Sequence, residues 1–128
     1  MKKMIYQQNR KREVLAAGEY LGFTYYILSL GTHPTAYIKI PEGHKYYKKS
    51  CDDIDLNVHG GLTFASDELY LDNIININGW FIGWDYAHFG DYLGYEMMYS
   101  HSFVSEDKKW TTEEILEEVK KACEELNK

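Results

Sequence analysis

Cysteine, proline and long apolar runs are all scarce in this chain of 128 residues. Its two cysteines, Cys51 and Cys123, are too few for a disulfide framework, so we expect reduced thiols in a cytoplasmic protein. No apolar run approaches the roughly 18 residues of a membrane span, and no signal-peptide core follows residues 1–3. The two prolines, Pro34 and Pro41, stand at expected turns. The sequence therefore predicts neither a membrane protein nor a disulfide-stapled secreted domain.

Positive charge is scarce outside the N-terminus. Residues 1–13 hold five basic residues and one acidic residue, whereas the rest of the chain holds nine basic and 19 acidic residues. Lys and Arg contacts to phosphates supply most of the non-specific affinity for nucleic acid. We therefore expect no nucleic-acid binding, and a basic run without a recognition motif is more often a solvated segment.

Aromatic residues, in contrast, are abundant: the chain has 12 Tyr, 5 Phe and 3 Trp. A hydrophobic fraction of 45% is ordinary for a globular protein, and the length predicts one domain spanning residues 1–128. A chain of this length can bury a core without disulfide or metal support.

The order of predicted elements indicates an α+β fold. We expect a short N-terminal helix within residues 1–18, ending at Gly18, and a helix over residues 111–127. Runs rich in β-branched and aromatic residues, or with alternating polarity, predict strands over residues 23–30, 35–40, 53–59, 62–64 and 79–85. Tight turns join the strands and leave no room for helical crossovers, so the sheet is predicted to be mainly antiparallel with the C-terminal helix packed on it.

Individual residues refine this prediction. Thr111 and Glu114 have the spacing of a capping box at the start of the C-terminal helix, and Cys123 falls on its apolar face. Gly83 in the middle of a strand indicates a bulge or the close approach of another backbone or ligand.

Two polar clusters follow apolar segments at positions where strands end. The first, in residues 53–59, alternates Asp, Asp, Asn and His with buried-type aliphatic residues and is followed by Gly60 and Gly61. The second comprises Asp85, His88 and Asp91, with Gly90 beside them. We expect the two clusters to converge in one polar site, with the following residues as ligand-binding candidates: Asp55, His59, Gly60, Gly61, Trp84, Asp85, His88 and Asp91.

Three chemistries fit such a site. Carboxylates and imidazoles can bind a divalent metal that activates water, although no known metal-ligand spacing occurs. A His–Asp pair can act as a general base, which makes His59, His88, Asp85 and Asp91 catalytic candidates. The same groups can instead hydrogen-bond a polar ligand, with glycine N–H groups available for an anion. Against each stands a simpler interpretation: solvated carboxylates, turn-capping histidines and tryptophans that belong to the core.

Other parts of the chain carry weaker signals. Asp52 and Asp53 follow Cys51 and would raise the pKa of its thiol, which disfavours a nucleophilic role. Residues 44–49 form a basic, aromatic run that can meet an anionic ligand, though such runs are more often solvated loops.

The strings HGGLT at 59–63 and GWFIGWDYAHFGD at 79–91 resemble a family of small phage and prophage proteins. The resemblance spans about residues 23–91. It implies a phage-related setting and a shared polar core, and by analogy a role in sequestering or destroying nucleotide immune signals.

These observations lead to a main hypothesis and two alternatives. The main one is a cytoplasmic, homo-oligomeric phage-type protein that binds a small polar or nucleotide-like ligand, with an anti-defence role. One alternative is a small hydrolase, metal-dependent or not, that uses the same His and Asp residues. The other is a structural or partner-binding domain.

Overall fold

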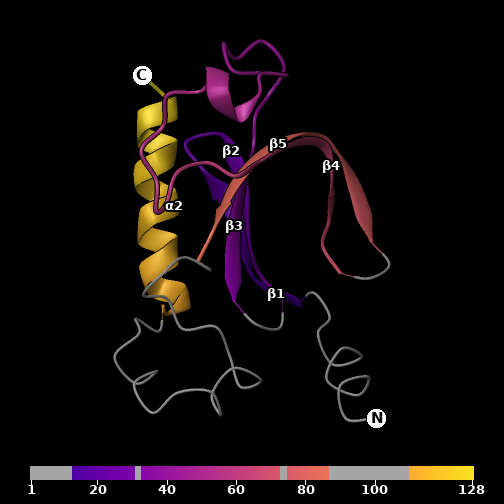
Figure 1. Cartoon of the computed structure of the whole chain (residues 1–128), viewed down its shortest axis with the longest axis vertical. Coiled ribbons are helices and arrows are strands. Elements are labelled where there is room, and N and C mark those ends of the chain that lie inside the picture. Colours follow the sequence, from indigo (N-terminus) through magenta and orange to yellow (C-terminus); the bar gives the residue numbers. More distant parts are fainter. Residues whose placement is uncertain (1–12, 31–32, 73–74, 87–109) are drawn as a thin grey trace.

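A computed structural model describes residues 13–30, 33–72, 75–86 and 110–128. It contains a five-stranded antiparallel sheet in the order β1-β2-β3-β5-β4 and a helix, α2, that lies across one face of the sheet (Figure 1). The elements are β1 (Glu13–Tyr20), β2 (Phe23–Ser29), β3 (Pro34–Lys39), the 3₁₀ turn η1 (Cys51–Asp53), β4 (Phe64–Tyr70), β5 (Asn76–Asp85) and α2 (Thr112–Leu126). The predicted α+β class and the antiparallel sheet are confirmed.

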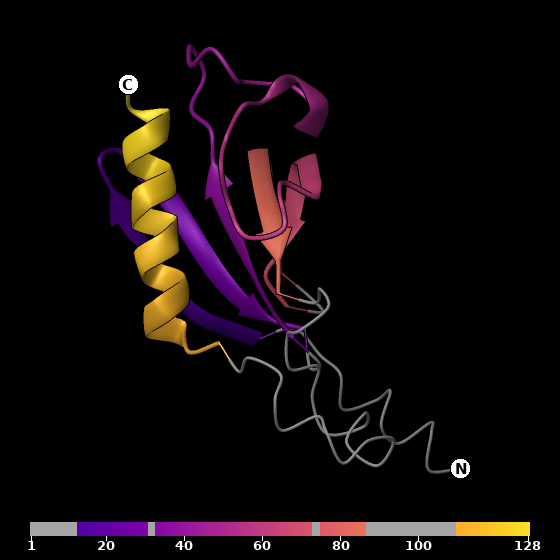
Figure 2. The same ribbon diagram turned by 60° about the vertical axis from the view of Figure 1, so that its left-hand side comes forward.

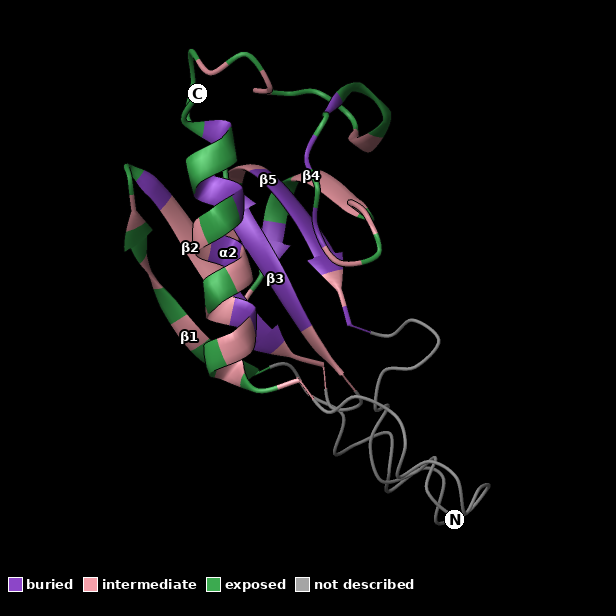
Figure 3. Ribbon diagram, turned by 90° about the vertical axis from the view of Figure 1, so that its left-hand side faces the viewer, coloured by how far each residue is buried: buried purple, intermediate pink, exposed green. Residues whose placement is uncertain are grey.

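Helix α2 begins as the sequence predicts. The hydroxyl of Thr111 accepts the backbone N–H of Glu114 at 3.1 Å, and the Glu114 carboxylate accepts the backbone N–H of Thr111 at 3.0 Å. This reciprocal pair satisfies two of the donors that a helix leaves free at its start. The buried residues of α2, which share one core cluster with residues of the sheet, are Ile115, Val119, Ala122, Cys123 and Leu126. Figure 3 colours the buried parts of α2 purple. We call the covered side of the sheet the helix face.

The two central strands, β3 and β5, sort their side chains between the two faces. Thr35 pairs with Asp85 and Ala36 with Trp84, in antiparallel register. Because successive side chains of a strand point to opposite faces, Ala36 and Trp84 lie on the helix face and Thr35 and Asp85 on the other. Both Ala36 and Trp84 belong to the core cluster that includes the buried side chains of α2.

The second face has a smaller core of its own. Leu28, Tyr37, Leu69 and Phe81 form a buried cluster there, although β2 and β4 are separated in the sheet by β3 and β5. A register shift between Ser66 and Glu68 bends β4, and the β4–β5 pair arches out of the plane of the sheet (Figures 1 and 2). The sheet therefore curls over this side, which we call the hairpin face.

The predicted N-terminal helix is wrong for the part that is described. Residues 13–20 form strand β1, paired with β2 from Glu13–Ser29 to Tyr20–Phe23, and Gly18 lies inside that strand. Ladder hydrogen bonds to β2 outweigh the local helical preference of this segment. Residues 1–12 lie outside the described ranges.

The predicted strand at residues 53–59 is also wrong, although its alternation is real. Ile54, Leu56 and Val58 are buried while Asp55 and Asn57 are exposed, as expected. The segment forms no ladder and instead adds its three aliphatic side chains to the core cluster of the helix face. Burial on one side produces the same period of two as pairing in a sheet does.

Candidate functional site

The structure places six of the eight predicted ligand-binding residues. His88 and Asp91 lie outside the described ranges, as does Gly90. The other six divide between the two faces of the sheet and the loop that precedes β4.

His59 lies on the helix face among aromatic rings. Its imidazole stacks on Tyr86, with centroids 4.7 Å apart and planes at 10°, and meets the edge of Trp110 at 4.9 Å. Its backbone N–H donates to Glu118 Oε2 of α2 at 2.8 Å. Gly60 and Gly61 follow with φ of 69° and 83°, which only glycine adopts without strain, and they turn the chain toward β4.

Trp84 and Tyr86 extend this polar network into the core. The indole N–H of Trp84 donates to the Tyr86 hydroxyl at 2.9 Å, and that hydroxyl donates to Glu118. Both aromatic side chains are fully buried. A buried polar group without a partner costs free energy, so these bonds tie α2 to β5 and stabilise the helix face.

Asp85 lies on the hairpin face, where its carboxylate has a fixed position. Its Oδ2 accepts the hydroxyl of Thr63 at 3.0 Å, and the Thr63 backbone N–H donates to Gly83 O at 3.0 Å. Beyond Asp85, the backbone N–H of Tyr86 donates to Pro34 O at 3.1 Å, which prolongs the β3–β5 ladder. The ladder on one side and Thr63 on the other thus hold the carboxylate.

A hollow of about 220 Å³ opens beside this carboxylate. We call it the Asp85 hollow; its polar and aromatic lining consists of His33, Thr35, Tyr37, Thr63, Phe64, Trp84 and Asp85. The rings of Tyr37 and Phe64 meet edge to face with centroids 5.0 Å apart. Polar groups with aromatic walls are typical of small-molecule sites.

Thr35 is the unusual member of this lining. Its side chain is 3% exposed, and its hydroxyl has no hydrogen-bond partner among the residues that the structure describes. An unpaired buried hydroxyl costs about 1–3 kcal/mol. A ligand that donates to or accepts from this oxygen would recover that free energy.

The predicted close approach at Gly83 is confirmed. A Cβ atom there would lie 2.5 Å from Cδ1 of Tyr37 and 2.7 Å from the backbone oxygen of Ala36. The missing side chain lets the Tyr37 ring lie across β5, where it lines the Asp85 hollow.

The structure separates His59 from Asp85 by face. His59 lies with Tyr86 on the helix face, whereas the Asp85 carboxylate belongs to the hairpin face. Asp55 is exposed, and its backbone N–H donates to the Tyr46 hydroxyl at 3.2 Å. His59 and Asp85 therefore do not share the one polar site that the sequence predicts, and the position of either relative to His88 and Asp91, which lie outside the described ranges, stays a prediction.

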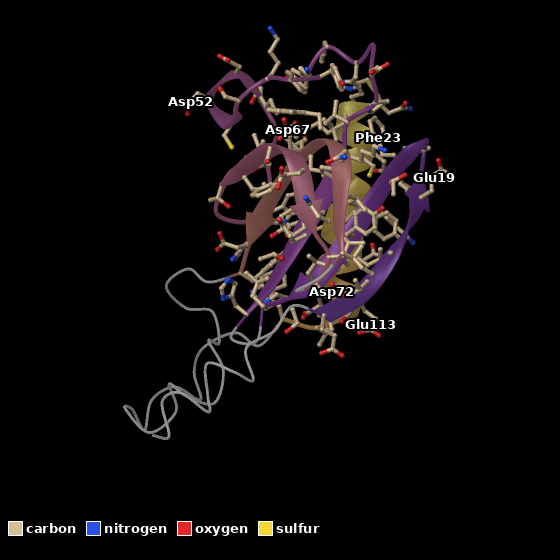
Figure 4. All side chains as sticks on the ribbon, turned by 90° about the vertical axis from the view of Figure 1, so that its right-hand side faces the viewer. Glu19, Phe23, Asp52, Asp67, Asp72 and Glu113 are labelled. Carbon is tan, nitrogen blue, oxygen red and sulfur yellow. The ribbon has the colours of Figure 1, made fainter. Side chains whose placement is uncertain are left out.

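Carboxylates elsewhere are dispersed. Asp52 lies near one end of the described part of the molecule and Glu113 near the other (Figure 4). Within the described ranges, no group of three or more His, Cys, Asp or Glu side chains is arranged to hold a metal ion. Burial, followed by the charge of Asp52, raises the pKa of the Cys51 thiol, as the sequence predicts.

Sequence reasoning missed Thr35 and His33 of the Asp85 hollow, and it missed a second hollow lined by Lys39 and Trp80. Nothing in the local sequence marks a threonine as unpaired, because that depends on the strand opposite it. One signal near the second hollow was the basic, aromatic run at 44–49, which contributes Tyr47.

Two further findings concern the whole chain. In the part that the structure covers, none of the helices has the length and apolarity to span a membrane. Comparison with protein-family models, curated proteins and solved structures found no match to this chain.

Proposed function

We propose that this protein binds a small polar ligand in the Asp85 hollow. The observation that carries the proposal is the unpaired hydroxyl of Thr35, buried in the wall of the hollow beside an oriented carboxylate. Leaving a buried hydroxyl unpaired lowers stability, and such groups are typical of sites shaped for a ligand rather than for the fold.

The chemistry of the lining favours a planar ring that carries N–H donors. The Asp85 carboxylate accepts hydrogen bonds, the Thr35 hydroxyl can donate or accept, and Tyr37 and Phe64 offer ring faces and edges. A volume of about 220 Å³ lies below the usual range of roughly 300–1,000 Å³ for drug-sized ligands. We therefore propose that the hollow takes one ring system, such as the base of a nucleotide-like ligand, and leaves the rest in solvent.

The biological role we propose is sequestration of a nucleotide-like signal. It rests on the resemblance to phage proteins together with this ring-binding chemistry. If the nucleobase donates to the Asp85 carboxylate, the phosphates of the ligand point into solvent, away from the negative charge of Asp85.

The proposal is tested by calorimetric titration with cytidine, adenosine, guanosine and uridine. The only ring donor of uridine is its N3–H, whereas the other three bases each carry an exocyclic amine that can donate to Asp85. Uridine should therefore bind more weakly than the best of the other three. Thr35→Val and Asp85→Asn should each weaken that nucleoside at least about tenfold, or about 1.4 kcal/mol. Thr35→Val removes one hydrogen bond, and Asp85→Asn replaces a charged acceptor with a neutral amide that has one acceptor oxygen.

Thr24→Val is the matched control, because Thr24 is also a strand threonine but does not line the Asp85 hollow. It should bind as the unmodified protein does. Thr35→Val should also unfold at the same or a higher urea concentration, because it removes an unpaired buried hydroxyl. If no nucleoside releases heat with folded protein, or if Thr35→Val and Asp85→Asn both bind normally, the proposal is wrong.

A further inference from the structure

The larger hollow lies at the opposite end of the β3–β5 pair. Along the β3–β5 ladder, Thr35 pairs with Asp85 at one end and Lys39 pairs with Phe81 at the other, about 14 Å away at roughly 3.4 Å per residue. The hollow has a volume of about 440 Å³, and its polar and aromatic lining includes Lys39, Glu42, Tyr47 and Trp80. We call it the Lys39 hollow.

Lys39 is placed in this hollow by a glycine on the neighbouring strand. Gly79 has a φ of 152°, and a Cβ atom there would lie 2.7 Å from Cε of Lys39. The lysine stem therefore occupies the space that a side chain at position 79 would fill. A left-handed glycine where another side chain passes is typical of a position shaped by a close approach.

Two aromatic side chains form walls that the fold holds in place. The indole N–H of Trp80 donates to the backbone oxygen of Lys49 at 3.1 Å, which ties the loop after β3 to β5. Ile40 N–H donates to Trp80 O at 2.7 Å and fixes the same strand end. The Tyr47 hydroxyl donates to Glu42 Oε2 at 3.4 Å. Trp80 and Tyr47 are only half-buried, so part of each side chain remains open to solvent.

We propose that the Lys39 hollow is a second binding site, for a small aromatic anion of single charge. The ammonium group of Lys39 would pair with a carboxylate or similar oxyanion, while the ring of the ligand packs on Trp80 and Tyr47. The negative charge of Glu42 at the exposed rim is matched by the ammonium of Lys48, 5.9 Å from the Tyr47 ring centroid. Lys39 then leaves one net positive charge, which suits an anion of single charge. This site is independent of the one at Asp85, because the two hollows share no lining residue.

The test uses benzoate as the probe, with acetate and benzylamine as comparison compounds. Binding is followed by the indole N–H resonance of Trp80 in ¹H–¹⁵N spectra, assigned with Trp80→Phe. Benzoate should shift this resonance saturably. Acetate lacks the ring and benzylamine has the opposite charge, so both should bind at least about tenfold more weakly.

Variants then separate the two charges. Lys39→Met should weaken benzoate about tenfold, and Glu42→Gln should strengthen it a few-fold because it removes a like charge. Lys120→Met is the matched control, because it removes an ammonium group that lies 5.7 Å from the ring of Tyr20 and outside the hollow. It should leave benzoate binding unchanged, as should Asp85→Asn.

The opposite results would overturn the proposal. Equal binding of benzoate and acetate would mean a simple charge effect at an exposed lysine, without a ring site. Stronger binding of benzylamine, weakened by Glu42→Gln, would mean a cation site. Absence of any shift at saturating benzoate in folded protein would mean that the hollow takes no such ligand.

Discussion

The two faces of the sheet are built from the same strands but differ in how their polar groups are paired. On the helix face, the buried indole N–H of Trp84 donates to the buried hydroxyl of Tyr86, which donates to the half-buried Glu118 of α2. On the hairpin face, a smaller apolar cluster adjoins a hollow in which the hydroxyl of Thr35 has no partner among the described residues. The helix face is completed by the chain itself, whereas the hairpin face leaves a polar gap that a ligand can fill.

Alternation along β3 and β5 makes this division compatible with one small fold. Ala36 and Trp84 face the helix while their neighbours Thr35 and Asp85 face the hollow. A residue of the proposed ligand site can therefore lie one position from a residue of the main core. Substitutions on the two faces should have separable effects, and three predictions test this difference.

The largest effect is expected from Gly83→Ala, which breaks the hairpin face. The new methyl group would lie 2.7 Å from Ala36 O, so the β3–β5 ladder has to shift as well as the Tyr37 ring. We expect a loss of about 3 kcal/mol in the free energy of unfolding, measured by urea titration, because overpacking against backbone relaxes poorly.

Gly18→Ala is its counterpart in β1, where Gly18 pairs with Tyr25. The nearest atom to its added methyl group is the Tyr25 hydroxyl oxygen at 2.6 Å, the far end of a side chain that can rotate away. Its cost should stay below about 1 kcal/mol. Equal losses for the two variants would show that the nearby backbone oxygen of Ala36 does not make position 83 less tolerant than position 18.

The next effect is expected from Tyr86→Phe, which breaks the polar network of the helix face. It leaves the Trp84 indole N–H without its acceptor and removes a donor from Glu118, while the ring stack with His59 persists. An unpaired buried donor predicts a loss of about 2 kcal/mol in the free energy of unfolding, again from urea titration.

Tyr20→Phe, in β1, removes a comparable hydrogen bond to the same helix, but at a solvent-exposed position. The Tyr20 hydroxyl donates to Glu124 Oε2 at 3.0 Å, in a solvent-exposed pair. Water can replace that partner, so its removal should change stability far less. A loss as large as that of Tyr86→Phe would contradict the role of burial in the network.

Elements marked by local chemistry could be predicted from the sequence. The Thr111–Glu114 capping box fixes the start of α2, and the alternation at 54–58 correctly identifies three core side chains. Strand β1 could not be predicted, because its structure depends on pairing with β2 rather than on its own residues. The same alternation misled at 54–58, where burial against the core replaces pairing in a sheet.

The candidate site was only partly visible for a similar reason. Asp85 stands out in the sequence as an acidic residue after an apolar strand, and the structure gives it an oriented place in a hollow. Thr35 does not stand out, since its unpaired state arises from the register that sets it opposite Asp85. His59 carried as strong a signal as Asp85, yet aromatic packing on the other face accounts for it.

The smallest effect is expected from the exclusion of water from the helix face, which the pKa of the Cys123 thiol reports. Burial, with a smaller contribution from Glu124, raises the pKa of this thiol from 9.0 to about 11. The folded state therefore favours the protonated thiol. The contribution of this preference to the free energy of unfolding is fully present below pH 9 and is lost as the pH rises through 11. By pH 10, about 1 kcal/mol of it has been lost.

Urea titrations at pH 8 and pH 10 measure this contribution as a difference between variants. Cys123→Ala should lose about 1 kcal/mol less than the unmodified protein over this interval, whatever its stability at pH 8, because it has no thiol to titrate. Cys51→Ala, at the half-buried cysteine of η1, should follow the unmodified protein more closely. If Cys123→Ala lost as much stability as the unmodified protein, the thiolate would be solvated under α2. Solvent would then reach the helix face under α2 as it reaches the hairpin face. This result would contradict the contrast between a closed core on one face and an open hollow on the other.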